Sequence, residues 1–344
     1  MPTSPTNFKD ELQAAVIDLL WRQWTCLGAG LEGRAAHDAH IIDPEALLLA
    51  TTTFGRHDQR LFDEALAWLV RFGSLINVQR LKNLHQGGKL GDPRVLGAVA
   101  AYVKNHGKLP KWGVLAQTGD SSVSQEPFFL SSKDARATHR GESDPDFLAH
   151  GWLRRAPRNK PLAMPPSPER HANVLLNLRA LIGVSSRCEI ILCLLTRPSA
   201  RAAELARLTG YSPQSIQTTL GEMILSGKVC SDEPHPEPGR GVRGMSRRFY
   251  MKTADLRFLW PAEYAPRWLP WAALFALSQG LHEALEGIQD ETLLSIQVRR
   301  MMQEHLPDLT ENLGYMLFGY NPDMTGSYLL NNLAADFPRM LRDL

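Results

Sequence analysis

A run of hydroxyl and amide side chains between residues 212 and 218 is the part of this sequence best suited to specific hydrogen bonding. Such groups donate and accept without net charge, and the glutamine amide matches the major-groove edge of adenine. Four arginines follow further along the chain, and guanidinium groups suit contacts with phosphate oxygens. The candidate residues for such contacts with nucleic acid are Ser212, Gln214, Ser215, Gln217, Thr218, Arg240, Arg243, Arg247 and Arg248.

The sequence lacks the common short motifs of catalysis and cofactor binding. It has no glycine loop ending in Lys-Ser or Lys-Thr, no GxGxxG after a predicted strand and no GxSxG elbow. His37 and His40 are spaced like two metal ligands but lack companions, and Asp144 and Asp146 lie in a proline-containing segment. We therefore expect a protein that is not an enzyme and has no catalytic residue, cofactor or metal.

The hydroxyl and amide run belongs to the second of two predicted helices. Residues 202–209 have apolar side chains at helical spacing, and Gly210 ends this first helix because the position after a helix often needs positive φ. Ser212 and Pro213 suit an N-cap and a first helical position, so a second helix is predicted over 213–226. Its outer face carries Gln214, Ser215, Gln217, Thr218 and Thr219, and its inner face carries Ile216, Leu220, Met223 and Ile224.

A hairpin is predicted after the second helix. Residues 228–230 have the character of a strand, and 232–244 form a loop because proline and glycine interrupt them. Residues 247–252 form the return strand, with Phe249 pointing inward. Residues 239–252 hold five basic residues and no acidic one, so the hairpin is suited to phosphate contacts.

This order of elements resembles the winged helix-turn-helix domains of bacterial transcription regulators of the MarR-like and ArsR-like kind. The run ELARLTGYSPQSIQTTLGEMILSGKV carries the resemblance, which covers about a fifth of the chain and begins with a helix near 184–196. The resemblance implies that the helix over 213–226 enters the major groove and that the hairpin, or wing, contacts the DNA backbone. Winged helices also bind proteins, so a protein-interaction role is the alternative.

The chain as a whole is predicted to be mainly α-helical, with a β-hairpin only in the wing. A change to Ser, Asp, Pro and Arg after about residue 117 marks a break in helical periodicity. The predicted regions are a helical bundle (1–116), an irregular linker (117–170), the winged helix-turn-helix (171–254) and a C-terminal helical region that is a candidate dimer interface (255–344).

Two further basic groups each allow two interpretations. Three helices near residues 45–86 are spaced like a second helix-turn-helix, although an ordinary bundle explains the pattern equally well. A basic cluster in the linker fits either a solvated segment or an arm that touches phosphates. The residues are Gln79, Arg80, Lys82 and Asn83 on an exposed face of the third helix, and Arg154, Arg155, Arg158 and Lys160 in the linker.

Charge is distributed unevenly along the chain. The formal net charge is only +2, but residues 184–252 hold ten basic and six acidic residues, whereas 253–344 hold six and twelve. A locally basic module on a nearly neutral protein is typical of a face that meets a polyanion.

Cysteine spacing and hydropathy indicate the compartment. The four cysteines, Cys26, Cys188, Cys193 and Cys230, have neither CxxC nor zinc-ligand spacing, so reduced and mostly buried thiols are expected. The first residues lack the pattern of a signal peptide, and no stretch approaches the roughly 20 apolar residues of a membrane helix. We therefore expect a cytoplasmic protein with no membrane partner.

Together these features predict a sequence-specific transcription regulator, a repressor that binds double-stranded DNA as a homodimer. The N-terminal bundle is then free to hold an unknown effector or protein partner. The alternative is a non-enzymatic protein-interaction or antitoxin-like subunit that uses the winged helix as a scaffold.

Overall fold

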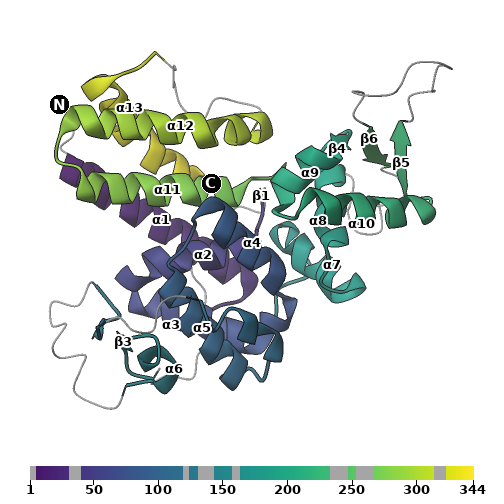
Figure 1. The fold of residues 1–344 in the computed structure, drawn as a ribbon, viewed down its shortest axis with the longest axis horizontal. Coiled ribbons are helices and arrows are strands. Elements are labelled where there is room, and N and C mark those ends of the chain that lie inside the picture. Colours follow the sequence, from purple (N-terminus) through teal and green to yellow (C-terminus); the bar gives the residue numbers. More distant parts are fainter. Residues whose placement is uncertain are drawn as a thin grey trace. The chain divides into compact units, whose positions relative to one another are not determined.

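The computed structural model describes residues 5–30, 40–118, 124–130, 143–156, 163–232, 247–252, 267–313 and 323–344. Most of these residues are helical, so the protein is mainly α-helical, as predicted. The chain divides into two compact units (Figure 1). Unit 1 is drawn from residues 1–37, 42–167 and 269–344, and unit 2 from residues 38–41 and 168–268.

Unit 1 is built almost entirely from helices. Its α-helices are α1 (Pro5–Leu27), α2 (Pro44–Phe54), α3 (Gln59–Phe72), α4 (Val78–Gly88), α5 (Pro93–His106), α6 (Pro145–Leu148), α11 (Trp271–Gly287), α12 (Glu291–Leu313) and α13 (Gly326–Asp343). Short 3-10 helices are η1 (Gly55–His57), η2 (Gly73–Leu75) and η3 (Pro110–Val114), and the two strands β2 (Glu126–Pro127) and β3 (Trp152–Leu153) pair in parallel.

The two ends of the chain share one core in unit 1. Helix α1 packs against α2, α11 and α13, and α11 packs against α12. Phe337 and Leu341 of α13 are buried, and the buried Arg22 of α1 donates from Nη2 to the carbonyl of Leu341 at 2.7 Å. The predicted region 255–344 is therefore not separate over α11–α13, because α11 and α13 pack on the N-terminal helix α1 and α12 packs on α11 and α13.

The starts of two helices in unit 1 follow their capping residues. The side chain of Asp43 accepts from the backbone N–H groups of Glu45 and Ala46, and Pro44 is the first residue of α2. Asp92 caps α5 in the same manner, with Pro93 as its first residue. Both starts follow from neighbouring residues, because an N-cap side chain and a proline at the first helical position act on backbone groups close in sequence.

Tryptophan side chains pack the interior of unit 1. The rings of Trp24 and Trp68 meet edge to face with centroids 5.6 Å apart. Each indole N–H has a partner: Trp24 donates to Oγ1 of Thr51 at 2.9 Å, and Trp68 donates to the carbonyl of Leu27 at 2.7 Å. These rings are unavailable for stacking on bases, because both are fully buried.

Arg80 does not lie on an exposed face of the third helix, and the prediction that it does is wrong. Only 1% of the residue is exposed. Its guanidinium pairs with Asp43 through Nη2 at 2.5 Å and with Glu45 through Nη1 at 2.6 Å. Arg80 therefore ties α4 to the start of α2, and a second helix-turn-helix would have to act without it.

Arg154 likewise belongs to neither a solvated linker nor a phosphate-contacting arm. It is buried, it pairs with Asp63 of α3, and its guanidinium carbon lies 4.5 Å from the centre of the Phe147 ring. The ion pair therefore holds the segment around β3 against α3. Arg155 is half-buried, whereas Arg158 and Lys160 lie outside the described residues.

Unit 2 combines a group of helices with a small sheet. Its helices are η5 (His171–Asn173), α7 (Val174–Ile182), α8 (Ser186–Leu195), α9 (Ala202–Thr209) and α10 (Pro213–Leu225). Its strands are β1 (His40–Ile41), β4 (Ala200–Arg201), β5 (Val229–Asp232), β6 (Arg248–Met251) and β7 (Arg267–Trp268).

Two small sheets define the topology of unit 2. Strand β6 lies between β4 and β5 and is antiparallel to both. Strands β1 and β7 pair in parallel, with Ile41 opposite Trp268. Unit 2 thus extends to residue 268 and includes residues 38–41, beyond the boundaries of 171–254 expected from the sequence.

Two histidines of unit 1 lie close together near the end of α2. The rings of His57 and His282 have centroids 5.9 Å apart, and Nε2 of His282 lies 3.2 Å from Oε1 of Gln13. Burial and the adjacent His282 lower the pKa of His57 to about 4, and burial also lowers the pKa of His282. Both imidazoles are therefore neutral in the folded protein near pH 7.

This pair predicts that stability falls in mild acid. An unfolded histidine takes up a proton near pH 6.5, whereas the folded pair resists it, so the stability is complete above about pH 6.5 and is lost as pH falls toward 4. We expect His57→Gln to flatten the dependence of the unfolding free energy on pH between 7 and 4.5, measured by urea denaturation. Exposed His106→Gln is the control, and an equal change in both variants would contradict the prediction.

Candidate nucleic-acid interface

The turn between α9 and α10 has the predicted geometry. Gly210 ends α9 with φ 75° and ψ 18°, a left-handed conformation that favours glycine. Ser212 is the N-cap of α10, where its Oγ accepts from the backbone N–H of Ser215 at 3.2 Å. Pro213 occupies the first turn of α10, where a missing N–H has no consequence.

Helix α10 has one buried and one exposed face. Ile216, Leu220 and Met223 are buried, as predicted. The predicted site residues Ser212, Gln214, Gln217 and Thr218 are exposed, and Ser215 is half-buried. The structure therefore brings the uncharged hydrogen-bonding residues of the prediction together on one side of α10 and its N-cap.

Thr219 is an exception to the predicted outer face. It is buried, its Oγ1 donates to the carbonyl of Ser215 at 2.9 Å, and the same atom lies 2.8 Å from Oγ of Ser186. The Ser186 contact joins α10 to the start of α8. Because 100° separates successive residues of a helix, Thr219 falls between the two faces, and only the packing of α8 decides its environment.

A buried carboxylate connects the turn to the helices behind it. Glu189 of α8 is fully buried and pairs with the buried Arg179 of α7. The hydroxyl of Tyr211, in the turn before α10, donates to Oε2 of Glu189 at 3.3 Å. This network fixes the start of α10 relative to α7 and α8.

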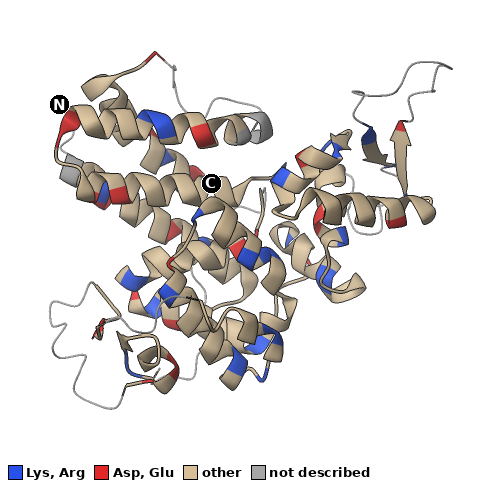
Figure 2. Ribbon diagram, viewed as in Figure 1, with Lys and Arg blue, Asp and Glu red and all other residues tan. Residues whose placement is uncertain are grey.

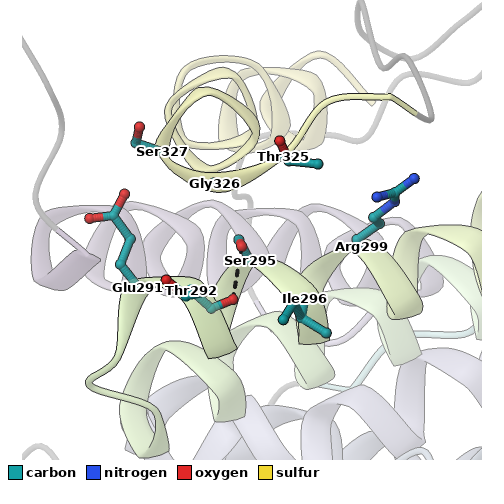
Figure 3. A pocket seen from close by; sticks show the side chains of 8 residues that line it. All are labelled: Glu291, Thr292, Ser295, Ile296, Arg299, Thr325, Gly326 and Ser327. Atoms are coloured by element: carbon teal, nitrogen blue, oxygen red, sulfur yellow. Dashed lines mark hydrogen bonds between the residues drawn. The ribbon is translucent and has the colours of Figure 1, made fainter.

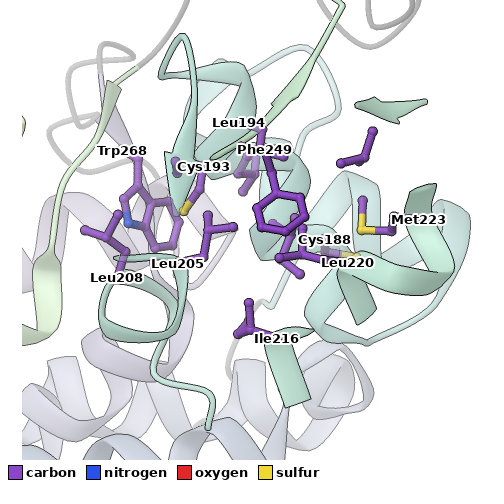
Figure 4. Close-up of a cluster of buried hydrophobic side chains, with 14 of the residues drawn as sticks. Cys188, Cys193, Leu194, Leu205, Leu208, Ile216, Leu220, Met223, Phe249 and Trp268 are labelled. Carbon is purple, nitrogen blue, oxygen red and sulfur yellow. The ribbon is translucent and has the colours of Figure 1, made fainter. Parts of the chain in front are cut away.

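The sheet packs onto the same core as the inner face of α10. Phe249 in β6 lies opposite Ala200 in β4 and opposite Ser231 in β5. Its ring is buried in the apolar cluster of unit 2, among residues that include Cys188 and Leu220 (Figure 4). Phe249 therefore points inward, as predicted.

Two of the four predicted arginines lie at the loop end of the β5–β6 pair, where Arg248 is opposite Asp232. Arg247 and Arg248 are exposed where β6 begins. Arg247 donates from Nε to Oγ of Ser231 at 2.9 Å, and Arg248 donates from Nε to Oγ of Ser199 at 2.8 Å. The other two, Arg240 and Arg243, lie outside the described residues.

The charges of unit 2 lie beside α10 rather than on its outer face. Helix α10 contains no Lys or Arg and one acid, Glu222, whereas β6 begins with a basic residue (Figure 2). The carboxylate of Glu222 pairs with the exposed Arg187 of α8. The exposed side of α10 is thus polar with one carboxylate, and Arg248 at the start of β6 lies opposite Asp232 at the end of β5.

Leu225 was not singled out from the sequence, although it lies on the outer side of α10. Its exposed fraction of 87% is unusually large for leucine. The helical rule that places Gln214 and Thr218 outside also places Leu225 there, so the signal was present in the sequence.

The cysteines of unit 2 do not form a reactive site. Cys188 and Cys193 are buried, and burial raises the pKa of the Cys188 thiol to about 11. Cys230 is half-buried in β5, opposite Tyr250. A neutral thiol is a weak nucleophile, so Cys188 serves packing.

A pocket of about 580 Å³ lies in unit 1 between α12 and the start of α13 (Figure 3). Glu291 and Arg299 project toward it from α12, and Oγ of Ser295 donates to the carbonyl of Thr292 at 2.9 Å. The charged side chains of the lining are Glu291 and Arg299. The lining residues are Glu291, Thr292, Ser295, Ile296, Arg299, Thr325, Gly326 and Ser327.

The aspartates considered for catalysis have structural partners. Asp144 is buried and caps α6 by accepting from the N–H groups of Asp146 and Phe147. Asp146 accepts from the side-chain amide of Asn105 at 2.6 Å. Over the described part of the chain, no three His, Cys, Asp or Glu residues are grouped as metal ligands, and His37 lies outside that part.

No family model, curated protein or solved structure matches the chain. Among the helices described, none combines the length and the apolar character that a membrane crossing requires.

Two glycine substitutions test the backbone requirements of the turn and of α10. Gly210→Ala should lower the unfolding free energy by about 1 kcal/mol, because alanine is strained at positive φ. Gly221→Ala should raise it by roughly 0.5–1 kcal/mol, because a Cβ there meets nothing within 4 Å and alanine favours helix. Urea denaturation followed by circular dichroism measures both, and shifts of the same sign would contradict the described turn.

Proposed function

We propose that unit 2 is a winged helix-turn-helix module that binds double-stranded DNA and that the protein is a transcription regulator. The observation that supports this most directly is the exposed, uncharged hydrogen-bonding face of α10. Gln214, Gln217 and Thr218 on this face can reach base edges. A helix that only faced solvent would more commonly carry Lys and Glu at such positions.

The order and pairing of elements support the same proposal. Helix α8 is followed by β4, then α9 and α10, and then by β5 and β6, which pair with each other. Helix α10 contacts β5, so the hairpin begins beside the proposed recognition helix. In this proposal, Arg247 and Arg248 at the start of β6 contribute phosphate contacts, and α10 contributes base contacts.

The proposal includes a homodimer that acts as a repressor. Helices α12 and α13 expose Leu293, Ile296 and Tyr328, each by 60% or more. Leu293 and Ile296 are three residues apart and therefore lie on the same side of α12. Exposed apolar side chains of this kind suit a contact between two copies, and a twofold dimer suits a palindromic site.

A protein-interaction subunit is the second candidate. Leu225, which is almost fully exposed at the end of α10, favours it, because an apolar side chain gains more from a protein contact than from DNA phosphates. Salt-dependent binding to duplex DNA distinguishes the two candidates, since a protein-binding module of this kind would show none.

Removing two arginines that the sequence predicts to lie in the wing should weaken DNA binding without changing sequence preference. For Arg240→Ala with Arg243→Ala, we expect lower affinity for all duplexes and a log–log salt slope smaller by about 2, because each phosphate contact contributes about 0.9. Fluorescence anisotropy at several salt concentrations measures this. The control is Arg339→Ala with Arg342→Ala, an equal change of charge on α13, and an equal loss in both variants would contradict the proposal.

The dimer predicts a specific effect of charge on α12. Leu293→Asp with Ile296→Asp should convert the dimer to a monomer and reduce the preference for a palindromic site over a single half-site. Light scattering measures the mass, and anisotropy measures the preference. Val114→Asp, at a position of equal exposure elsewhere in unit 1, is the control. A wild-type protein that is monomeric at micromolar concentration would rule out this part of the proposal.

A further inference from the structure

The outer face of α10 has a restricted chemistry in its first two turns. Gln214, Gln217 and Thr218 are exposed there, and Ser215 is half-buried beside them. Because successive residues turn by 100°, Gln214 lies about 40° from Thr218 and about 60° from Gln217. Two amides and a threonine therefore point within one arc of roughly 100°, with no cationic side chain among them.

These groups complement A·T base pairs better than G·C pairs. A glutamine amide donates to N7 and accepts from the N6 amino group of adenine in one bidentate contact, and the threonine methyl group packs against the thymine methyl group. The most frequent specific contact to guanine comes from Arg or Lys, and neither occurs in α10.

Cytosine also lacks a suitable partner on this face. Its N4 amino group is recognised by Glu or Asp, and Glu222 is the one acid in α10. The carboxylate of Glu222 is engaged by Arg187 of α8. The exposed groups that remain are those that fit adenine and thymine.

We propose that α10 reads A·T base pairs in the major groove, with Gln214 and Gln217 each contacting an adenine. This inference depends on the proposed DNA-binding function and specifies its target. The two glutamines are three residues apart, a rise of about 4.5 Å along the helix. Base pairs are stacked about 3.4 Å apart, so the two adenines are neighbours or are separated by one base pair.

The test is a selection from random duplexes followed by replacement of single atoms in the selected site. The intact wild-type chain is expected to enrich half-sites containing two closely spaced adenines. Replacing one of these adenines by 7-deazaadenine removes N7 and keeps the base pairing. A complete bidentate contact discriminates between bases by about 1–3 kcal/mol, which corresponds to a roughly 5- to 150-fold change in affinity. Because 7-deazaadenine loses one of the two hydrogen bonds, the affinity should fall by no more than this change.

Variants assign each adenine to its glutamine. Gln214→Ala should lose sensitivity to 7-deazaadenine at one position and Gln217→Ala at the other, while both keep the salt slope of the wild type. Gln297→Ala, which removes an exposed glutamine from α12, should behave as the wild type. Unchanged thermal unfolding of all three variants shows that folding is not the cause, because the altered side chains are exposed.

The possible outcomes distinguish the inference of A·T readout from the proposal that the protein binds DNA. Salt-dependent binding with enrichment of G·C-rich sites, or with no effect of 7-deazaadenine, would overturn A·T readout and leave DNA binding intact. The absence of salt-dependent duplex binding would overturn both. Position-specific loss of sensitivity in the two glutamine variants would support both.

Discussion

The buried carboxylate of Glu189 connects three elements of unit 2, namely α7, α8 and the turn before α10. It pairs with Arg179 of α7 and accepts a hydrogen bond from Tyr211 in the turn before α10. A buried ion left without its partner would cost about 3–5 kcal/mol, so these groups must stay together in the folded unit. The direction in which α10 leaves the turn is therefore set by α7 and α8, and the polar outer face of α10 follows from that direction.

The inner side of α10 packs in the core of unit 2, and its outer side is exposed. Its inner residues, including Ile216 and Leu220, share the apolar cluster with Phe249 of β6, so the helix and the sheet are held by one core (Figure 4). Because that core stabilises the unit, the outer side chains contribute little to folding and can be selected for binding chemistry. In the proposed complex with DNA, the arginines of β6 would contact phosphates and the polar face of α10 would contact bases.

Local features of the site could be predicted from the sequence, whereas long-range partners could not. Gly210 and Ser212 were assigned correctly, because a helix end and an N-cap depend on backbone groups within a few residues. Arg80 and Arg154 were placed at the surface by their residue type, yet both are buried against carboxylates distant in sequence. A single sequence does not show which acid will be present to pair with a given arginine.

The sequence by itself determined the helical content, the turn at Gly210 and the uncharged face of α10, since these follow from periodicity, backbone preference and residue type. Only the tertiary structure decided that Thr219 turns inward to Ser186 and that α11–α13 join the N-terminal helices in one core. The physical reason is that a side chain at the border of a helix face, and an apolar face in general, is buried by whichever element packs against it. That element is chosen by the fold as a whole.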